Sequence, residues 1–242
     1  MKVLAVIPAR YNSQRFPGKP LAKIAERPMI EWVYKAAESC SVFNRVVVAT
    51  DSDRIVNCVK QFGGEVEMTS SDCSTGTDRV AEIAKRYPEV DVVANVQGDQ
   101  PFVTFKMLNQ LISPYVAGKR PDMTTLACPL DLESKYSDPN TVKVVCDRDN
   151  RALYFSRASI PYYRTSGVAP VYHHLGLYGF RRDFLLKYTQ LEPTPLEQCE
   201  GLEQLRVLEH GFAIEVCQVE QQILEVNTPE DLTKANDVVH SN

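Results

Sequence analysis

The chain has 242 residues and a formal net charge of −4 at pH 7, with 44% hydrophobic and 24% charged residues. A chain of this length forms one large domain or two small ones, and it buries enough surface to need no disulfide or metal staple. The slight acidic excess argues against a general nucleic-acid coat, which needs a basic surplus, although arginines can still gather in one cleft.

The first half of the sequence alternates between two kinds of segment. Short β-branched runs predict strands over 3–7, 45–50, 66–69, 90–96 and 123–128, and segments of helical periodicity predict helices over 28–40, 53–62, 77–86 and 105–113. The valine-rich runs are typical of strands buried on both faces. This half is therefore predicted to form an α/β structure around a parallel sheet.

The second half breaks this alternation. Strands are predicted over 142–146 and 152–155, joined by a turn at 147–150, and over 175–180 and 213–219. Helices are predicted over 184–188, 196–209 and from 229 to about 239, with a polar loop over 162–170. The predicted fold is a Rossmann-like, mostly parallel sheet flanked by helices with a smaller mixed lobe, as one domain over 1–242.

Cysteine use and the apolar runs suggest a compartment. The seven cysteines are widely spaced and include no C-x-x-C pair, which disfavours zinc and indicates small buried side chains in a reducing cytoplasm. The apolar run at 2–7 is too short for a signal peptide, and no run approaches the roughly 18 residues of a membrane span. We therefore expect no membrane partner.

The loop after the first strand carries the strongest local signal. Arg10, Arg15 and Lys19 fall within ten residues that also contain Pro17 and Gly18. Ligands of open α/β sheets bind at the carboxyl ends of strands, where these cations suit phosphates or carboxylates. The loop is neither G-x-G-x-x-G nor a Walker sequence, which argues against a dehydrogenase or a P-loop enzyme. A solvated basic loop is the alternative.

Two further segments point to the same edge of the sheet. Asp99 follows a buried strand and Gly98, where it could be a magnesium ligand or only a turn residue, and Gly98 would let the backbone approach a ligand. The segment from Ser74 to Arg79 opens a helix whose N-terminus could meet a base or a phosphate, although Thr77 could serve only as its N-cap.

The ordered motifs resemble those of bacterial sugar-acid cytidylyltransferases, above all the 3-deoxy-manno-octulosonate cytidylyltransferase family. Besides the loop at 7–21, the matching motifs are 48–51, 68–70, 74–79, 95–99, 152–157, 174–176 and 202–206. The resemblance implies a nucleotide-diphospho-sugar transferase fold, with 1–130 mainly binding nucleotide and 131–220 mainly binding sugar and forming a dimer. It implies a cytoplasmic homodimer that transfers CMP from CTP to the acid sugar for lipopolysaccharide biosynthesis, with Mg²⁺ as cofactor.

The resemblance also implies roles for individual residues. The catalytic residues would be Arg10, Arg15, Lys19 and Asp99. The nucleotide would contact Pro8, Ala9, Arg10, Lys19, Ser74, Gly76, Thr77, Arg79 and Asp99. The sugar would contact Gln97, Arg157, His174, Tyr178, Glu203 and Gln204, and the metal ligands would be Asp99 and Asn227. Arg157 suits a carboxylate, whereas core packing of Tyr178 and a solvated Glu203 are the simpler alternatives.

Two positions depart from the family pattern. Gln100 stands where the family usually has Glu, and Asn227 stands where it usually has the second metal-binding Asp. The asparagine at 227 predicts weaker metal binding or help from Glu225, two residues earlier on the same strand face. The Gln100 form is similar to a subgroup that uses the 8-amino analogue of the sugar. Another acid sugar or base is a further alternative, and Asn227 favours a last one, a non-catalytic nucleotide-binding or regulatory homologue.

Overall fold

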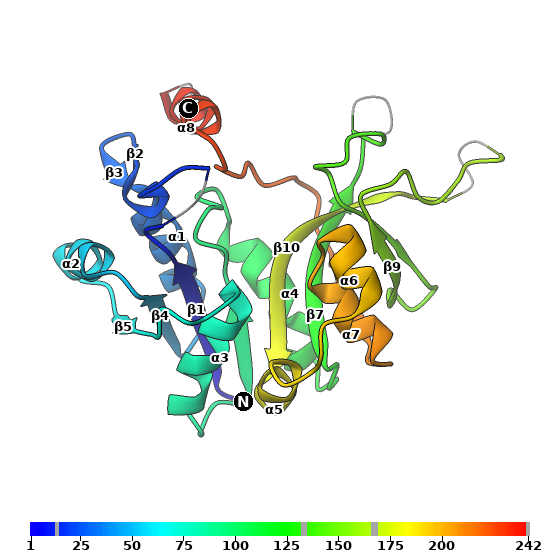
Figure 1. Cartoon of the computed structure of the whole chain (residues 1–242), viewed down its shortest axis with the longest axis horizontal. Coiled ribbons are helices and arrows are strands. Elements are labelled where there is room, and N and C mark those ends of the chain that lie inside the picture. The colour runs from blue at the N-terminus through cyan, green and yellow to red at the C-terminus, as the bar shows by residue number, and fades with distance from the viewer. Residues whose placement is uncertain (13–14, 132–134, 166–168, 241–242) are drawn as a thin grey trace. The chain divides into compact units, whose positions relative to one another are not determined.

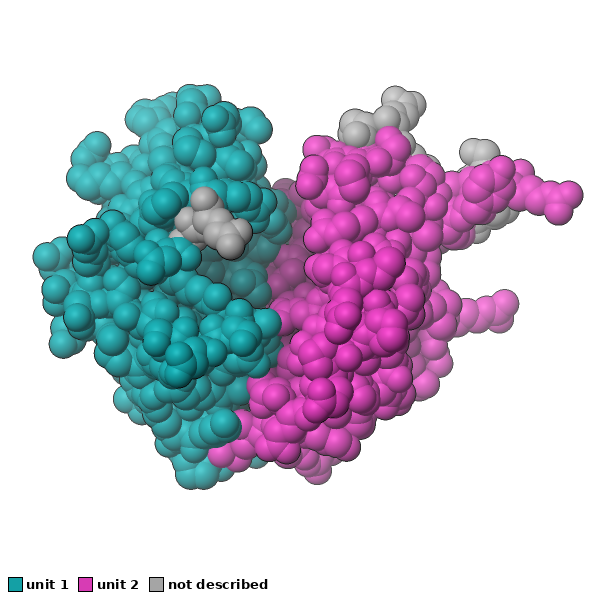
Figure 2. Space-filling view, viewed as in Figure 1, with its two compact units in different colours: residues 1–109, 223–242 teal, residues 110–222 magenta. Residues whose placement is uncertain are grey.

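The computed structural model describes residues 1–12, 15–131, 135–165 and 169–240 (Figure 1). It contains two compact units, residues 1–109 with 223–242 and residues 110–222 (Figure 2). Residues 13–14 of the basic loop and 166–168 of the predicted polar loop lie outside the described residues. We call the two parts unit 1 and unit 2. The predicted α/β class is confirmed.

Unit 1 is built on parallel strands. Its sheet has the order β6-β1-β4-β5, with β6 (Val92–Asn95), β1 (Val3–Ala9), β4 (Arg45–Thr50) and β5 (Val66–Met68). Each neighbouring pair is parallel, so the carboxyl ends of all four strands meet at one edge. Almost every residue of β1, β4 and β6 is buried, as the continuous apolar runs predicted.

The helices of unit 1 follow the prediction closely. They are α1 (Met29–Glu38), α2 (Asp53–Gln61), α3 (Gly76–Arg86), α8 (Pro229–His240) and the first residues of α4 (Phe105–Val116). The predicted end of α4 before Pro114 is wrong, because the helix continues and buries Tyr115. A 3-10 turn η1 (Lys19–Leu21) and the hairpin of β2 (Lys23–Ile24) and β3 (Arg27–Pro28) were not predicted.

Side-chain hydrogen bonds to the backbone fix the first residues of helices α3 and α8. At the start of α3, the Thr75 hydroxyl accepts from the Asp78 N–H while the Asp78 carboxylate accepts from the Thr75 N–H. The N-cap is therefore Thr75 and not Thr77. At the start of α8, the Thr228 hydroxyl accepts from the Asp231 N–H and the Asp231 carboxylate accepts from the Thr228 N–H. Thr228 is therefore the N-cap, as predicted.

The C-terminal segment returns to unit 1 after unit 2. Val226 and Ala235 are fully buried in a cluster with Ile24 and Met29. The Asn236 carboxamide also accepts a bond from the Ala25 N–H, which ties α8 to the β2–β3 hairpin beside it in Figure 1. These contacts hold the segment before α8 in a fixed place on unit 1.

Unit 2 has a mixed sheet. Strand β7 (Met123–Pro129) is antiparallel to β10 (Tyr172–Arg181) and parallel to β11 (Ile214–Gln218). The predicted hairpin is confirmed as β8 (Lys143–Cys146) and β9 (Ala152–Ser156), and β8 also pairs with β10. This arrangement places β10 between two antiparallel neighbours.

The helices of unit 2 correct one prediction. They are α5 (Arg182–Tyr188), α6 (Pro195–Glu200) and α7 (Gln204–Glu209), so the single helix predicted over 196–209 is wrong. Gly201 ends α6 with a φ of 62°, a left-handed conformation that glycine adopts without steric cost. In the described part of the chain, no helix is long and apolar enough to cross a membrane.

Candidate nucleotide site

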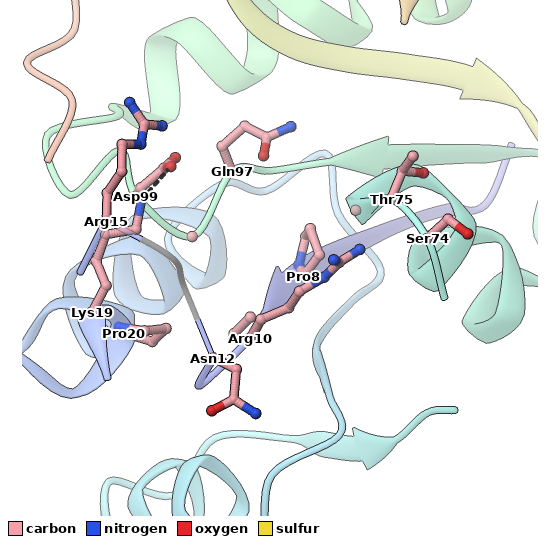
Figure 3. A pocket seen from close by; sticks show the side chains of 13 residues that line it. Pro8, Arg10, Asn12, Arg15, Lys19, Pro20, Ser74, Thr75, Gln97 and Asp99 are labelled. Carbon is pink, nitrogen blue, oxygen red and sulfur yellow. Dashed lines mark hydrogen bonds and ion pairs between the residues drawn. The ribbon is translucent and has the colours of Figure 1, made fainter. Parts of the chain in front are cut away.

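A pocket of about 690 Å³ lies at the carboxyl ends of β1 and β6 in unit 1 (Figure 3). Nine of the predicted site residues line it: Pro8, Ala9, Arg10, Arg15, Lys19, Ser74, Gly76, Gln97 and Asp99. Asn12, Pro20, Thr75 and Gly98 complete its lining. Segments that are far apart in sequence meet here because parallel strands bring their carboxyl ends to one edge.

The floor of the pocket depends on a close backbone approach. A Cβ atom added to Gly98 would lie 2.9 Å from the carbonyl oxygen of Pro8. No larger residue fits there without a backbone shift, so Gly98 lets the ends of β1 and β6 come together. The predicted approach of the Gly98 backbone to a ligand stays a prediction, and the structure adds that the Pro8 backbone also requires a glycine here.

Three cations face the pocket, each with a different degree of pairing. Lys19 Nζ lies 2.7 Å from Asp99 Oδ2, and both side chains are largely buried. Arg15 Nη2 donates to Asn227 Oδ1 over 3.3 Å. Among the described residues, Arg10 Nη2 is buried without any hydrogen-bond partner. Because a buried guanidinium N–H is costly to leave unpaired, this atom marks a place for an anionic oxygen.

The opposite side of the pocket is the N-terminus of α3. Ser74, Thr75 and Gly76 line it there, while Arg15, Lys19 and Asp99 gather at the other side in Figure 3. Backbone N–H groups at a helix N-terminus carry partial positive charge and bind anions. The pocket thus combines two kinds of anion-binding group at its two sides.

Two predicted nucleotide contacts lie beneath this lining. Arg79 is fully buried, with Nη2 2.8 Å from Asp51 Oδ2 and Nη1 hydrogen-bonded to Thr69. Thr77 is buried, and its hydroxyl accepts from the Asn95 amide over 3.3 Å. Sequence reasoning missed the role of Asp51 as the partner of Arg79. Its only signal was the position of Asp51 directly after a buried strand.

Oxygen ligands for a cation gather beside Lys19. The described residues contain no group of three or more His, Cys, Asp or Glu that could hold a metal. Asp99 and Asn227 nevertheless offer a carboxylate and a carbonyl oxygen, and Glu225 contacts Asn227. Burial raises the pKa of Glu225 and the charge of Asp99 raises it further, while Gln100, Asn227 and Lys19 oppose the rise. This donor set fits Mg²⁺, which takes one or two carboxylates together with substrate phosphates.

In unit 2, three of the predicted sugar-binding residues form a buried chain of hydrogen bonds. Tyr178 donates to Gln204 Oε1 over 3.1 Å, and Gln204 Nε2 lies 3.4 Å from His174 Nδ1. His174 Nε2 lies 2.9 Å from the hydroxyl of Thr125, which donates to the Leu177 carbonyl. If each group donates to the next, His174 carries its proton on Nε2. Burial lowers the pKa of His174 to about 3, so the ring is neutral.

The other two residues of this predicted set lie near α6 and α7. Arg157 donates from Nε to the Glu200 carbonyl over 2.8 Å and from Nη1 to the Pro139 carbonyl over 3.0 Å. The Glu200 carboxylate accepts from the Arg157 N–H and the Ser156 hydroxyl, a role that sequence reasoning missed. Glu203 precedes α7, and its carbonyl accepts from the Tyr188 hydroxyl.

A parallel sheet with a cationic loop and a helix N-terminus at its carboxyl edge defines a nucleotide-binding α/β enzyme. The family model described as cytidylyltransferase matches residues 4–221. The chain is 66% identical over 235 residues to the 3-deoxy-manno-octulosonate cytidylyltransferase of Acaryochloris marina, covering 97% of this chain and 96% of the relative. It is 43% identical to the enzyme of the same name from Fusobacterium nucleatum, covering 100% and 98%.

The comparison with solved structures agrees. A structure of CMP:2-keto-3-deoxy-manno-octonic acid synthetase complexed with CTP superposes with a TM-score of 0.96 at 38% identity, covering 100% of this chain and 99% of the other. The chain belongs to the cytidylyltransferase family, and within it to the 3-deoxy-manno-octulosonate cytidylyltransferases. It is therefore a nucleotidyltransferase, which excludes the dehydrogenase considered from the sequence.

Proposed function

We propose that this chain transfers CMP from CTP to the anomeric hydroxyl of 3-deoxy-D-manno-octulosonate, releasing pyrophosphate and supplying the CMP-sugar for lipopolysaccharide biosynthesis. The names of the relatives and the CTP complex of the similar structure support this reaction. The observation that carries it to this chain is Arg10 Nη2, which is buried without a hydrogen-bond partner among the described residues in a pocket that Lys19 also lines. A triphosphate supplies the anionic oxygens that this geometry lacks.

In the proposed reaction the hydroxyl oxygen of the sugar bonds to the α-phosphorus while the bond to the pyrophosphate oxygen breaks and the hydroxyl proton passes to solvent. The protein forms no covalent bond and contributes position and charge. Arg10, Arg15 and Lys19 neutralise phosphate oxygens, and the N–H groups at the start of α3 bind the nucleotide. Arg157, His174 and Gln204 are proposed sugar contacts, in line with the family resemblance.

Mg²⁺ is part of the proposal, with Asp99 as its carboxylate and Asn227 as a carbonyl ligand. When bound, it would neutralise triphosphate charge and lower the pKa of the attacking hydroxyl. Lys19 holds the Asp99 carboxylate in place over 2.7 Å. Asp99 is thereby oriented at the carboxyl end of β6, where phosphates would lie.

A cytoplasmic homodimer also belongs to the proposal. All seven cysteines are free, which suits a reducing compartment. The dimer rests on the family resemblance alone, and light scattering of the purified protein tests it by giving the mass in solution.

The test of the reaction is pyrophosphate release from CTP or UTP with 3-deoxy-D-manno-octulosonate or its 8-amino analogue. We expect release with CTP and the hydroxy sugar. Release only with the 8-amino sugar would reassign the acceptor, and release with UTP would reassign the base. Calorimetric binding of CTP with no release at high magnesium would identify a non-catalytic homologue.

A further inference from the structure

The segment before α8 lies against the backbone of Asp99. The Val226 N–H donates to the Asp99 carbonyl over 2.9 Å, and the Val226 side chain is fully buried in the core of unit 1. The structure assigns no strand to 222–227, so the predicted strand face is wrong here. Glu225 and Asn227, the two sequence neighbours of Val226, nevertheless contact each other through their side chains over 3.2 Å.

Two amides hold the Glu225 carboxylate, one at each oxygen. Gln100 Nε2 donates to Oε1 over 3.0 Å, and Asn227 Nδ2 donates to Oε2 over 3.2 Å. Both donors are neutral, so they orient the carboxylate without cancelling its charge. Within the described part of the chain, no lysine or arginine forms an ion pair with Glu225.

The side-chain amide of Asn227 lies between a positive and a negative group and presents a complementary atom to each. Its oxygen faces Arg15 Nη2 at 3.3 Å, and its nitrogen faces Glu225 Oε2. An aspartate at 227 would bring two carboxylate oxygens about as close as that amide contact, which is repulsive unless a cation lies between them. The asparagine is thus the residue type that an anionic Glu225 requires.

Glu225 also faces the centre proposed to hold the metal. Gln100, which donates to Glu225, directly follows Asp99 in sequence, and the N–H of Val226, next to Glu225, donates to the Asp99 carbonyl. Lys19 is paired with Asp99. Lys19 can balance only one of these two carboxylates, and a divalent cation would balance the remaining charge.

We propose that Glu225 is the second carboxylate of the divalent-cation site at Asp99, and that Gln100 and Asn227 are the positioning residues that hold it. This inference rests on the proposed function, in which Mg²⁺ binds at Asp99. In this proposal the carboxylate of Glu225 supplies the negative charge that Asn227 lacks.

The test measures Mn²⁺ binding by electron paramagnetic resonance, with Mn²⁺ alone and with Mn²⁺ plus CTP. We expect Glu225→Gln, which keeps the size of the side chain, to raise the Kd at least about tenfold. Glu230→Gln, a change of the same kind at an exposed position in the first turn of α8, should leave the Kd unchanged. Wild-type affinity in Glu225→Gln would overturn the proposal.

A relocation variant separates ligand charge from local structure. In Glu225→Gln with Asn227→Asp, the carboxylate moves to 227 and the amide moves to 225. We expect this double variant to recover most of the Mn²⁺ affinity that Glu225→Gln loses. A loss without recovery would show that the geometry rather than the charge was damaged, and it would overturn the proposal.

The positioning role has its own measurement. Gln100→Met removes the donor and keeps an unbranched side chain, and we expect it to weaken Mn²⁺ binding less than Glu225→Gln does. Unchanged affinity would overturn the role of Gln100. Pyrophosphate release by the wild type is assayed in parallel. If the wild type binds Mn²⁺ through Glu225 but releases no pyrophosphate, the proposed reaction is contradicted. If the wild type releases pyrophosphate and Glu225→Gln keeps full Mn²⁺ affinity, only this inference is contradicted.

Discussion

The two units use their polar side chains in opposite ways. In unit 1, Arg10, Arg15 and Lys19 line an open pocket, and Arg10 Nη2 there has no hydrogen-bond partner among the described residues. In unit 2, His174, Tyr178 and Gln204 are buried and bond to one another. The first arrangement leaves an atom for a ligand to pair, whereas in the second the side chains position one another. Polar residues that a sequence motif marks equally can thus either face a ligand or bond to one another.

The largest effect on stability should come from the buried ion pair of Arg79 and Asp51 in unit 1, whose side chains satisfy each other as those of the polar chain in unit 2 do. Arg79 is fully buried and its ion-pair partner Asp51 has a side chain 25% exposed. Asp51→Ala would leave a buried charge unpaired, and we expect the free energy of unfolding to fall by about 3 kcal/mol. Urea unfolding measures this, with the exposed Asp72→Ala as control. A loss no larger than that of the control would contradict a structural role for Arg79.

Removing a pocket cation should affect catalysis more than stability, although Lys19 is also paired with Asp99. We expect Lys19→Met to lower kcat for pyrophosphate release by about 10²–10³-fold, because a preorganised positive charge is lost where the phosphates would lie. The exposed Lys23→Met serves as the matched control. Equal activity of the two variants would show that the Lys19 charge does not act on the reaction.

Breaking the chain of hydrogen bonds in unit 2 should lower stability. Thr125→Val removes the hydroxyl between His174 Nε2 and the Leu177 carbonyl and leaves both buried groups unpaired. We expect the free energy of unfolding to fall by about 1–3 kcal/mol. The exposed Thr165→Val is the control, and urea unfolding is the measurement. Unchanged stability would mean that this chain of bonds does not hold unit 2 together.

The smallest effect concerns pH. Burial, with the charges of Lys135 and Lys143, lowers the pKa of His173 to about 4. Between pH 6.5 and 4 the unfolded chain therefore binds a proton that the folded chain does not, so stability falls as pH falls. We expect His173→Gln to remove about 1 kcal/mol of the loss between pH 7 and 5. The exposed His210→Gln should keep the wild-type slope, and an equal slope in both variants would contradict the assignment.

Local patterns predicted most of the fold. The strands of unit 1 were found because a buried parallel strand is a continuous apolar run, which the sequence displays directly. The break at Gly201 was missed because a glycine within a helical pattern is compatible with a continuous helix, and the end depends on its left-handed φ. The extension of α4 past Pro114 depends on the burial of Tyr115, which is a tertiary contact.

The pocket was predictable where its residues follow strands directly, as Arg10 does, or within a few residues, as Asp99 does. Pairings between distant positions were not. Gln100 and Glu225 are 125 positions apart, and Arg79 and Asp51 belong to different elements. The hydrogen bond between His174 and Thr125 depends on the register of β7 and β10, which is irregular between His174 and Tyr178. No local pattern encodes such a register.

The bond from the Val226 N–H to the Asp99 carbonyl has a consequence for the order of events during synthesis. Ribosomes make the chain from its N-terminus, and domains fold as their residues emerge. The strands, the cationic loop and α3 are complete by residue 109, yet the segment from 223 that joins Asp99 is made only after all of unit 2. A nascent chain can therefore form the phosphate-facing walls early, while the Asp99 centre gains its C-terminal neighbours as one of the last steps.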